Sequence, residues 1–186
     1  TGADERAVPQ DGPEFMSTPG PTPPTAPVAV VIPAFNVVCD IRRCIDSVLQ
    51  QSLPPAEVIV VDDGSTDGTP ELVERTYGRH PGVTLIRTPH RGGAASPGAA
   101  RNTGWNQARA PFVHFVDGDD WLEPEAYVEL AETLRDHPDL ELYCASYRQV
   151  ERDSGAERLR LRCAEGIYPR AAGAFRALQP SGSDFA

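Results

Sequence analysis

The pattern of apolar and polar positions along the chain alternates between two kinds of segment. Short runs of consecutive apolar residues predict buried strands, and apolar residues that recur every three or four positions predict helices. The predicted strands are 28–32, 57–61, 83–86, 112–116 and 140–147. The predicted helices are 38–51, 67–77, 99–109 and 124–134. This alternation predicts an α/β fold with a mostly parallel sheet and helices on both faces.

The two ends of the chain lack this pattern. Residues 1–27 are rich in Pro, Thr, Gly and acidic residues, which predicts a disordered segment. We expect residues 1–15 to derive from cloning and Met16, the only methionine, to be the native start. The predicted core is 28–150, and charged residues around 151–161 favour an exposed hairpin. We expect 151–186 to be part of an acceptor-side or C-terminal segment.

Three of the predicted strands end in residues that could bind a ligand. The first ends at Pro33, the second runs into Asp62 and Asp63, and the fourth runs into the acidic stretch 117–120. Ligands of open α/β sheets bind outside the carboxyl ends of strands, so these ends should border one crevice. Loop carboxylates suit Mg²⁺ or Mn²⁺, which share their coordination with substrate phosphates. The alternative for each acidic cluster is a solvated turn or a helix cap, Asp67 or Thr69 being the expected cap of the second helix.

Composition excludes several classes of function. The 186 residues are 40% hydrophobic and 24% charged, which is typical of one soluble globular domain. The net charge of -10 argues against a nucleic-acid partner. The chain has no lysine, so Schiff-base chemistry and a P-loop lysine are excluded. No apolar run is long enough for a transmembrane helix or a signal peptide, and we expect a cytoplasmic location, free or at the inner face of the membrane.

The cysteines do not have the spacing of a zinc site. Cys39, Cys44, Cys144 and Cys163 form no CxxC pair and have no histidine cluster beside them. The prediction is therefore four buried, reduced thiols in a reducing compartment.

Four motifs carry a family resemblance. They are Val-Ile-Pro-Ala-Phe-Asn at 31–36, Val-Val-Asp-Asp-Gly-Ser-Thr-Asp-Gly-Thr at 60–69, Gly-Ala-Ala-Arg-Asn-Thr-Gly at 98–104 and Phe-Val-Asp-Gly-Asp-Asp-Trp-Leu-Glu-Pro at 115–124. In this order, over roughly 28–147, they resemble the family-two glycosyltransferases. The resemblance implies the GT-A fold, a nucleoside diphosphate sugar donor, with UDP favoured, and Mn²⁺ or Mg²⁺. It also implies transfer with inversion to an acceptor hydroxyl, on a glycan, a polymer such as an envelope polysaccharide, or a lipid carrier.

The resemblance implies roles for individual residues. The nucleotide-binding residues that it implies lie at the three strand ends and on the third helix: Pro33, Ala34, Phe35, Asn36, Asp62, Asp63, Arg101, Asp117 and Gly118. The metal would be held by Asp119 together with Asp117, whereas Asp120 would shape the loop or cap the next helix. For Arg101, an ion pair with a neighbouring acid is an equal alternative.

Two departures from the family pattern bear on the function. His90 stands where the family usually has Asn, in a loop that is longer than usual. The family takes its catalytic base from an acidic motif well downstream of the DXD-type motif, and the last acid here is Asp184, the candidate base. We therefore expect the donor-binding part of a larger enzyme.

Two other readings of the sequence remain open at this point. The first is a nucleotide-binding module without turnover. The second is a haloacid-dehalogenase-like phosphatase that uses Asp117 and Asp119 as nucleophile and acid. A dinucleotide dehydrogenase is disfavoured because no GxGxxG follows the first strand.

Overall fold

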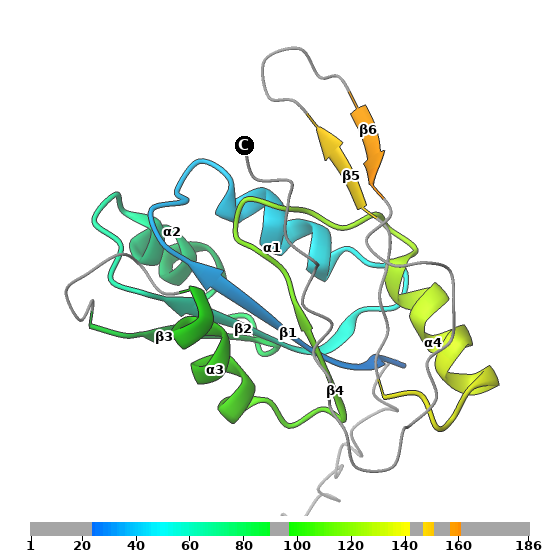
Figure 1. Ribbon diagram of the computed structural model, residues 1–186. Coiled ribbons are helices and arrows are strands. Elements are labelled where there is room, and N and C mark those ends of the chain that lie inside the picture. The colour runs from blue at the N-terminus through cyan, green and yellow to red at the C-terminus, as the bar shows by residue number, and fades with distance from the viewer. Residues whose placement is uncertain (1–23, 90–96, 142–146, 151–156, 161–186) are drawn as a thin grey trace, which may run out of the picture.

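The computed structural model describes residues 24–89, 97–141, 147–150 and 157–160. Four strands form one parallel sheet in the order β3-β2-β1-β4 (Figure 1). The strands are β1 (Ala26–Ala34), β2 (Pro55–Asp62), β3 (Val83–Arg87) and β4 (Phe112–Phe115). The helices between and after them are α1 (Ile41–Leu49), α2 (Thr69–Tyr77), α3 (Pro97–Gln107) and α4 (Ala126–Asp136). The predicted α/β fold with a parallel sheet is confirmed.

Helices cover both faces of the sheet, as the continuous apolar strands predict (Figure 1). On one face, alternate residues of β1 and β2, such as Val30 and Val58, pack with buried side chains of α1, α2 and α4. On the other face, Val31 and Ile59 pack with Ala100 of α3. Neighbouring strand residues point to opposite faces, so β1 and β2 are buried on both sides.

Helix α3 approaches β1 through a glycine. A Cβ atom at Gly104 would lie only 2.3 Å from Cγ1 of Val31, which is 0% exposed. No side chain fits at that position unless the helix or the strand moves. The glycine therefore fixes how close α3 lies to the sheet, and α3 carries Arg101.

Pro33 does not end the first strand, so that prediction is wrong. The carbonyl of Val31 accepts from the amide of Val116, and the carbonyl of Ala34 accepts from the amide of Asp63. Alternate residues of a strand bond to the same neighbour, so the nitrogen of Pro33 is directed toward β4, which has already ended at Phe115. Proline is tolerated here because no ladder bond is lost.

All four helices differ from their predicted bounds by two or three residues, and two of these differences have a local explanation. Helix α1 begins at Ile41 rather than at 38, because a turn precedes it in which the amides of Asp40 and Ile41 donate to the carbonyl of Val37. The N-cap residue of α2 is Gly68, at φ 92°, whereas the sequence predicts Asp67 or Thr69 for that position. A positive φ is favourable for glycine, which has no Cβ.

The last described elements form an antiparallel pair. Strand β5 (Tyr147–Val150) pairs with β6 (Glu157–Arg160). Strand β6 falls within the predicted hairpin 151–161, whereas β5 precedes that range, and the predicted strand 140–147 overlaps β5 only at Tyr147. Residues 142–146 and 151–156 lie outside the described part.

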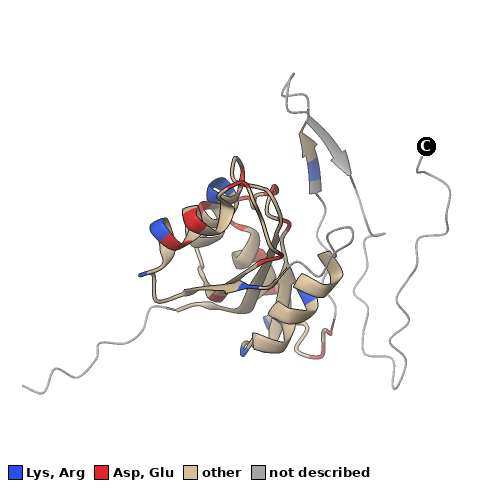
Figure 2. Ribbon diagram, turned by 90° about the vertical axis from the view of Figure 1, so that its left-hand side faces the viewer, with Lys and Arg blue, Asp and Glu red and all other residues tan. Residues whose placement is uncertain are grey.

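Charge and cysteine positions refine two further predictions. Figure 2 shows arginine and acidic positions distributed over several elements of the described chain. Cys44 is buried and free as predicted, whereas Cys39 is exposed, which corrects the prediction for that thiol. Cys144 and Cys163 lie outside the described residues. None of the described helices has the length and apolar character needed to cross a membrane.

Candidate functional site

The carboxyl ends of β1, β2 and β4 lie at one edge of the sheet, as predicted. Strand β1 lies between β2 and β4, so the loops that follow these three strands are neighbours. The chain places β2 and β3 on one side of β1 and then returns to place β4 on the other side. Such a switch point in strand order is where open α/β sheets bind ligands. The candidate site is therefore the edge between the loops after β1, β2 and β4.

The two acids at the end of β2 occupy different environments. Asp62 is 2% exposed, and among the described residues only the amide of Ser65 reaches its carboxylate, at 3.3 and 3.4 Å. These contacts are long, so the carboxylate keeps capacity to accept stronger hydrogen bonds. Asp63 is half-buried; its amide donates to Ala34 and its carboxylate accepts from the hydroxyl of Thr88 at 3.2 Å. Asp62 is the better placed of the two to receive a donor from a ligand.

The loops after β1 and β2 are fastened to each other at Asn36. Its amide donates to Oγ of Ser65 at 2.9 Å, and its side-chain oxygen accepts from the amide of Thr66 at 2.8 Å. Asn36 has a φ of 53°, a conformation that asparagine tolerates better than most residues. These contacts give Asn36 a role within the loops, and its contact with a nucleotide stays a prediction.

A second set of contacts joins the same two loops at Asp67. Its carboxylate accepts from the amide of Val38 at 3.0 Å and from the amide of Thr69 at 2.9 Å. The hydroxyl of Thr69 donates to the same carboxylate and accepts from the amide of Val37 at 3.1 Å. We call the contacts of Asn36, Ser65, Asp67 and Thr69 the loop clamp. The clamp sets the position of the loop that carries Phe35. Phe35 is 38% exposed.

The acidic loop after β4 meets helix α3 through an ion pair. Arg101 of α3 binds the carboxylate of Asp117, with both side chains partly exposed. The structure thus brings together two of the predicted site residues. This ion pair is one of the two alternatives that the sequence leaves open for Arg101, the other being contact with the nucleotide.

Gly118 lets the acidic loop pass close to β1 and α1. A Cβ atom at Gly118 would lie 3.2 Å from the carbonyl oxygen of Pro33 and 3.1 Å from Cγ2 of Val37. These distances are shorter than ordinary van der Waals contact, so a larger residue would move the loop away from the strand. The role of the buried Gly118 is consequently steric, and it brings the neighbouring carboxylates close to the sheet edge.

The thiol of Cys44, on α1, forms a hydrogen bond to the acidic loop. It donates to the backbone carbonyl of Asp117 at 3.5 Å. Burial, followed by the charges of Asp120, Asp119 and Asp117, raises the pKa of Cys44 to about 12. The thiol therefore stays protonated at neutral pH and remains a donor. Asp119 and Asp120, in contrast, are exposed.

Strand β4 also carries His114, which does not belong to the candidate site at the sheet edge. Nδ1 of His114 lies 3.0 Å from the hydroxyl of Tyr127 on α4. Burial lowers the pKa of His114 and raises the pKa of Tyr127. The pair is therefore neutral at physiological pH and acts as packing between β4 and α4.

The acidic loop has the carboxylates that a divalent metal would need if a substrate supplied the remaining ligands. Within the described ranges, no three His, Cys, Asp or Glu side chains form a metal-binding group. Asp119 is exposed, and Asp117 already pairs with Arg101. Mg²⁺ and Mn²⁺ commonly take one or two protein carboxylates together with substrate phosphates, and Asp119 with Asp117 fits that donor set.

Some site predictions cannot be placed and some contacts were not predicted. The candidate base Asp184 and the loop residue His90 lie outside the described residues. Sequence reasoning missed the supporting role of Cys44 and that of Ser47, whose Oγ accepts from the amide of Leu122 at 3.0 Å. The two residues are three apart on α1 and so lie on the same face of the helix. This spacing alone does not predict that the face contacts the acidic loop.

Comparisons with known proteins found a matching family and related proteins. The model of the family described as Glycosyl transferase family 2 matches residues 29–180. The chondroitin synthase of Pasteurella multocida (strain Pm70) is 41% identical over 111 residues, which are 59% of this chain and 11% of that protein. The putative glycosyltransferase EpsH of Bacillus subtilis (strain 168) is 32% identical over 128 residues, 68% of this chain and 36% of that protein. The chain thus spans about a tenth to about a third of the length of these relatives.

Solved structures show the same fold. TarS of S. aureus has a TM-score of 0.54 at 30% identity, covering 66% of this chain and 21% of that chain. TarS 1-349 in complex with UDP-GlcNAc has a TM-score of 0.54 at 32% identity, covering 60% of this chain and 32% of that chain. This likeness confirms the GT-A fold that the sequence motifs imply.

Proposed function

Because the chain belongs to glycosyl transferase family 2, we propose that its sheet edge binds a nucleoside diphosphate sugar and that the sugar is transferred to an acceptor hydroxyl. The observation that carries this proposal is the convergence of Asp62, Arg101 and Asp117 from three separate elements on one edge. The complex of TarS with UDP-GlcNAc, a structure with the same fold, favours UDP as the nucleotide.

The nucleobase is proposed to lie over the loops after β1 and β2. Phe35 offers exposed ring surface, and Asp62 has a carboxylate that can accept from a base N–H group. Pro33 and Ala34 would border the same space from β1. The loop clamp holds this side in one conformation before the ligand arrives, which lowers the entropy lost on binding.

The ribose and diphosphate are proposed to lie at the acidic loop. Asp117 would accept from ribose hydroxyls, and Arg101 would then face the diphosphate with its charge. Asp119 together with Asp117 would hold Mn²⁺ or Mg²⁺, which when bound offsets the negative charge that develops on the departing diphosphate. Every fixed side-chain cation of this chain is an arginine, so Arg101 and the metal share that task.

Transfer with inversion needs a group that removes the proton of the attacking acceptor hydroxyl. The candidate from the sequence is Asp184, which lies outside the described residues. The assignment of the base to Asp184 therefore stays a prediction. Its test is loss of turnover in Asp184→Asn with unchanged UDP affinity.

The first experiment is a calorimetric titration of UDP, with GDP and CDP alongside, in Mn²⁺ and again in EDTA. We expect UDP to bind more tightly in Mn²⁺, and we expect Asp119→Asn to weaken that binding at least tenfold, about 1.4 kcal/mol, through loss of a metal ligand. The matched control is Glu132→Gln, which removes an exposed acid from α4. Equal affinity of Asp119→Asn and the unaltered chain in Mn²⁺ would contradict the metal assignment.

Turnover assays separate the remaining alternatives. Release of UDP from UDP-GlcNAc that increases with added acceptor indicates a transferase. Nucleotide binding without donor consumption indicates a binding module. Hydrolysis of p-nitrophenyl phosphate, lost in Asp117→Asn, would favour the phosphatase, but the family match favours glycosyl transfer.

A further inference from the structure

Helix α1 contacts both ends of the acidic loop with two side chains of one face. The thiol of Cys44 donates to the backbone carbonyl of Asp117 at 3.5 Å. Oγ of Ser47 accepts from the amide of Leu122 at 3.0 Å. The residues between these two contacts include the proposed metal ligand Asp119. The helix therefore sets the separation of the two points between which the metal-binding carboxylate lies.

The hydroxyl of Ser47 is oriented for its contact with the loop. It donates to the carbonyl of Cys44 at 2.7 Å, so its proton is directed to the helix and a lone pair is left for the amide of Leu122. Inside a helix, serine is less favourable than alanine because its side chain competes with the backbone for hydrogen bonds. The helix alone thus gives no reason for a serine here, and the contact with the acidic loop does.

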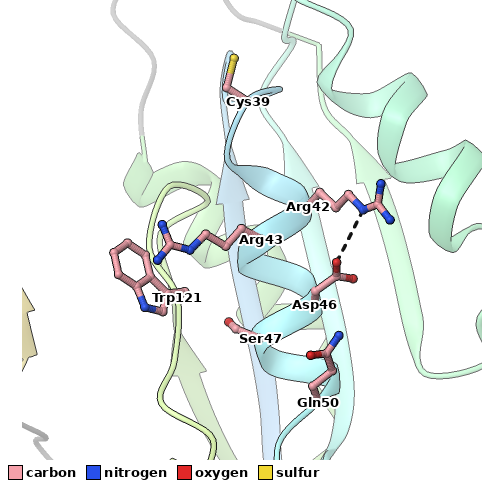
Figure 3. Close-up of a pocket in the computed structure, with 7 residues that line it drawn as sticks. All are labelled: Cys39, Arg42, Arg43, Asp46, Ser47, Gln50 and Trp121. Carbon is pink, nitrogen blue, oxygen red and sulfur yellow. Dashed lines mark ion pairs between the residues drawn. The ribbon is translucent and has the colours of Figure 1, made fainter. Parts of the chain in front are cut away.

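A third contact from the same side of α1 reaches an aromatic side chain directly after the acidic loop. The guanidinium carbon of Arg43 lies 3.3 Å from the centre of the Trp121 ring, and a cation over a ring face is attracted by the ring. Figure 3 shows Arg43 and Ser47 on the side of α1 that faces Trp121. Arg42 points to the other side of the helix, where it pairs with Asp46. Arg43 therefore belongs to the contacts with the loop, and Arg42 does not.

The chain that follows the loop is held by a buried amide group. Gln51, which is 5% exposed, donates from Nε2 to the carbonyl of Glu123 at 2.6 Å and to that of Ser47 at 3.1 Å. Its Oε1 accepts from the amide of Tyr127 at 3.2 Å. Movement of this segment would leave a buried polar group unpaired, which is costly. The downstream end of the loop is consequently anchored on both sides of Leu122.

Fixed ends matter for a loop of this charge. Asp117, Asp119 and Asp120 lie within four residues, and their like charges repel one another when no cation is present. A loop that was free at its ends would relieve this repulsion by spreading, and a metal would then have to draw it together again. A loop whose ends are held binds the metal with a smaller loss of conformational entropy.

We propose that Ser47 is a positioning residue of the metal site: from α1 it fixes the downstream end of the acidic loop, so that Asp119 is placed to bind the metal that accompanies the diphosphate. Arg43 and Gln51 hold the neighbouring residues. The proposal rests on the proposed function, because it deepens the metal-binding role given there to Asp119. Ser47 acts through the backbone at Leu122 and not by contact with the metal.

The test is the affinity of the 186-residue chain for UDP in Mn²⁺ and in EDTA, measured by calorimetry for the unaltered protein and for Ser47→Ala. A fraction of unfolded protein would lower both affinities alike, so the ratio of the two affinities reports the metal. We expect this ratio to fall about tenfold in Ser47→Ala, as is typical when a group that orients a metal ligand is removed. The affinity in EDTA should not change.

The matched control is Ser52→Ala. It removes a hydroxyl that donates to the carboxylate of Glu125 at 2.8 Å, a contact with the same segment but beyond the acidic loop. The ratio of affinities should equal that of the unaltered chain. An unchanged ratio in Ser47→Ala, or an equal fall in both variants, would overturn the proposal.

Amide hydrogen exchange measured by mass spectrometry locates the effect. The amides of Asp120 and Leu122 are both hydrogen-bonded, to the carbonyl of Asp117 and to Ser47 respectively. In Ser47→Ala, peptides that cover them should exchange faster, whereas the amides of the loop clamp should keep their rates. Faster exchange over the whole chain without a local excess would show general destabilisation and overturn the positioning role.

These outcomes are distinct from failure of the proposed function. Metal-dependent UDP binding by the unaltered chain, with the same ratio in Ser47→Ala, would overturn the positioning role alone. Equal affinity of the unaltered chain in Mn²⁺ and in EDTA would contradict the metal assignment and this proposal with it. Absence of UDP binding would contradict the nucleotide site. Mn²⁺ would then be titrated alone, where weaker binding to Ser47→Ala would support the positioning role and equal binding would overturn it.

Discussion

The two sides of the candidate site are held in different ways. The loops after β1 and β2 are joined by the loop clamp, in which side chains of one loop bond directly to backbone amides of the other. The acidic loop after β4 is held from neighbouring helices and the turn after α1, by the Arg101–Asp117 ion pair, the Cys44 thiol, the Ser47 hydroxyl and the amide of Gln51, whose Nε2 donates to Glu123 at 2.6 Å. Its carboxylates at Asp119 and Asp120 are exposed.

This difference matches what each side is proposed to do. A nucleobase keeps its shape and its charge throughout a sugar transfer, so loops that are held in one conformation recognise it best. The diphosphate gains negative charge as the sugar departs. A carboxylate that can change its hydrogen-bond or ion-pair partners adjusts to this added charge more readily. We therefore interpret the clamped side as the recognition side and the acidic loop as the reacting side. The variants below alter one side at a time.

The largest effect on stability is expected from Gly104→Ala, which affects the support of Arg101. The new Cβ would lie 2.3 Å from the side chain of Val31, so α3 must move away from β1. We expect the free energy of unfolding to fall by about 1–3 kcal/mol, measured by urea denaturation. The control Gly82→Ala would add a methyl group at ordinary contact distance, 3.4 Å from His80. Equal stability of the two variants would show that the close approach of α3 is not required.

A smaller effect is expected from Asp67→Ala, which opens the loop clamp. The amides of Val38 and Thr69 lose their acceptor, as in the removal of a helix cap, and we expect a loss of about 1 kcal/mol. UDP affinity should fall as well, because the loop of Phe35 is no longer fixed. Unchanged UDP affinity with reduced stability would show that the clamp is structural only.

The same clamp predicts a pH dependence. Burial acts to raise the pKa of Asp67, but hydrogen bonds from Thr69 and Val38 outweigh it and lower the pKa below its ordinary value of 3.8. A carboxyl group with a lowered folded-state pKa stabilises the protein above its unfolded pKa, and this contribution is lost as the pH falls through the folded pKa. The stability difference between Asp67→Asn and the unaltered chain should therefore shrink between pH 5 and pH 3.

The smallest effect on stability is expected from Arg101→Gln. Both members of its ion pair with Asp117 are partly exposed, and such pairs contribute about 0.2–1 kcal/mol. Nucleotide affinity should nevertheless fall severalfold, since Arg101 is proposed to face the diphosphate. The control Arg135→Gln breaks an exposed pair with Asp136 on α4 and should leave UDP binding unchanged. A large loss of stability without loss of affinity would assign Arg101 to the fold instead.

Much of the fold and the centre of the site could be predicted from the sequence. Apolar runs such as 28–32 and 58–61 are long enough to identify buried parallel strands without tertiary information. Acids directly after such strands, at Asp62 and at 117–120, were expected at one edge because parallel strands place their carboxyl ends together. The strand order, with β1 between β2 and β4, places both acidic ends at the same edge.

Contacts between loops could not be predicted in the same way. The bond from Val38 to Asp67 joins residues 29 positions apart, and only the folded register decides which amide the carboxylate meets. The prediction that Pro33 ends the strand is wrong because the sequence does not reveal to which neighbouring strand a given residue directs its nitrogen. The stacking of Arg43 on Trp121 likewise depends on how the loop after β4 turns toward α1.

The proline within β1 has a consequence for how far the pairing of β1 with β4 can extend. If the pairing of β1 with β4 continued past Phe115, an N–H group at position 33 would meet the carbonyl of Val116. Proline lacks that hydrogen, so no ladder bond from position 33 joins β1 to the chain after β4. The acidic loop still passes close to Pro33, since a Cβ atom at Gly118 would lie 3.2 Å from its carbonyl oxygen. The loop proposed to hold the ribose and the diphosphate can therefore shift against the strand without the loss of a hydrogen bond from this residue.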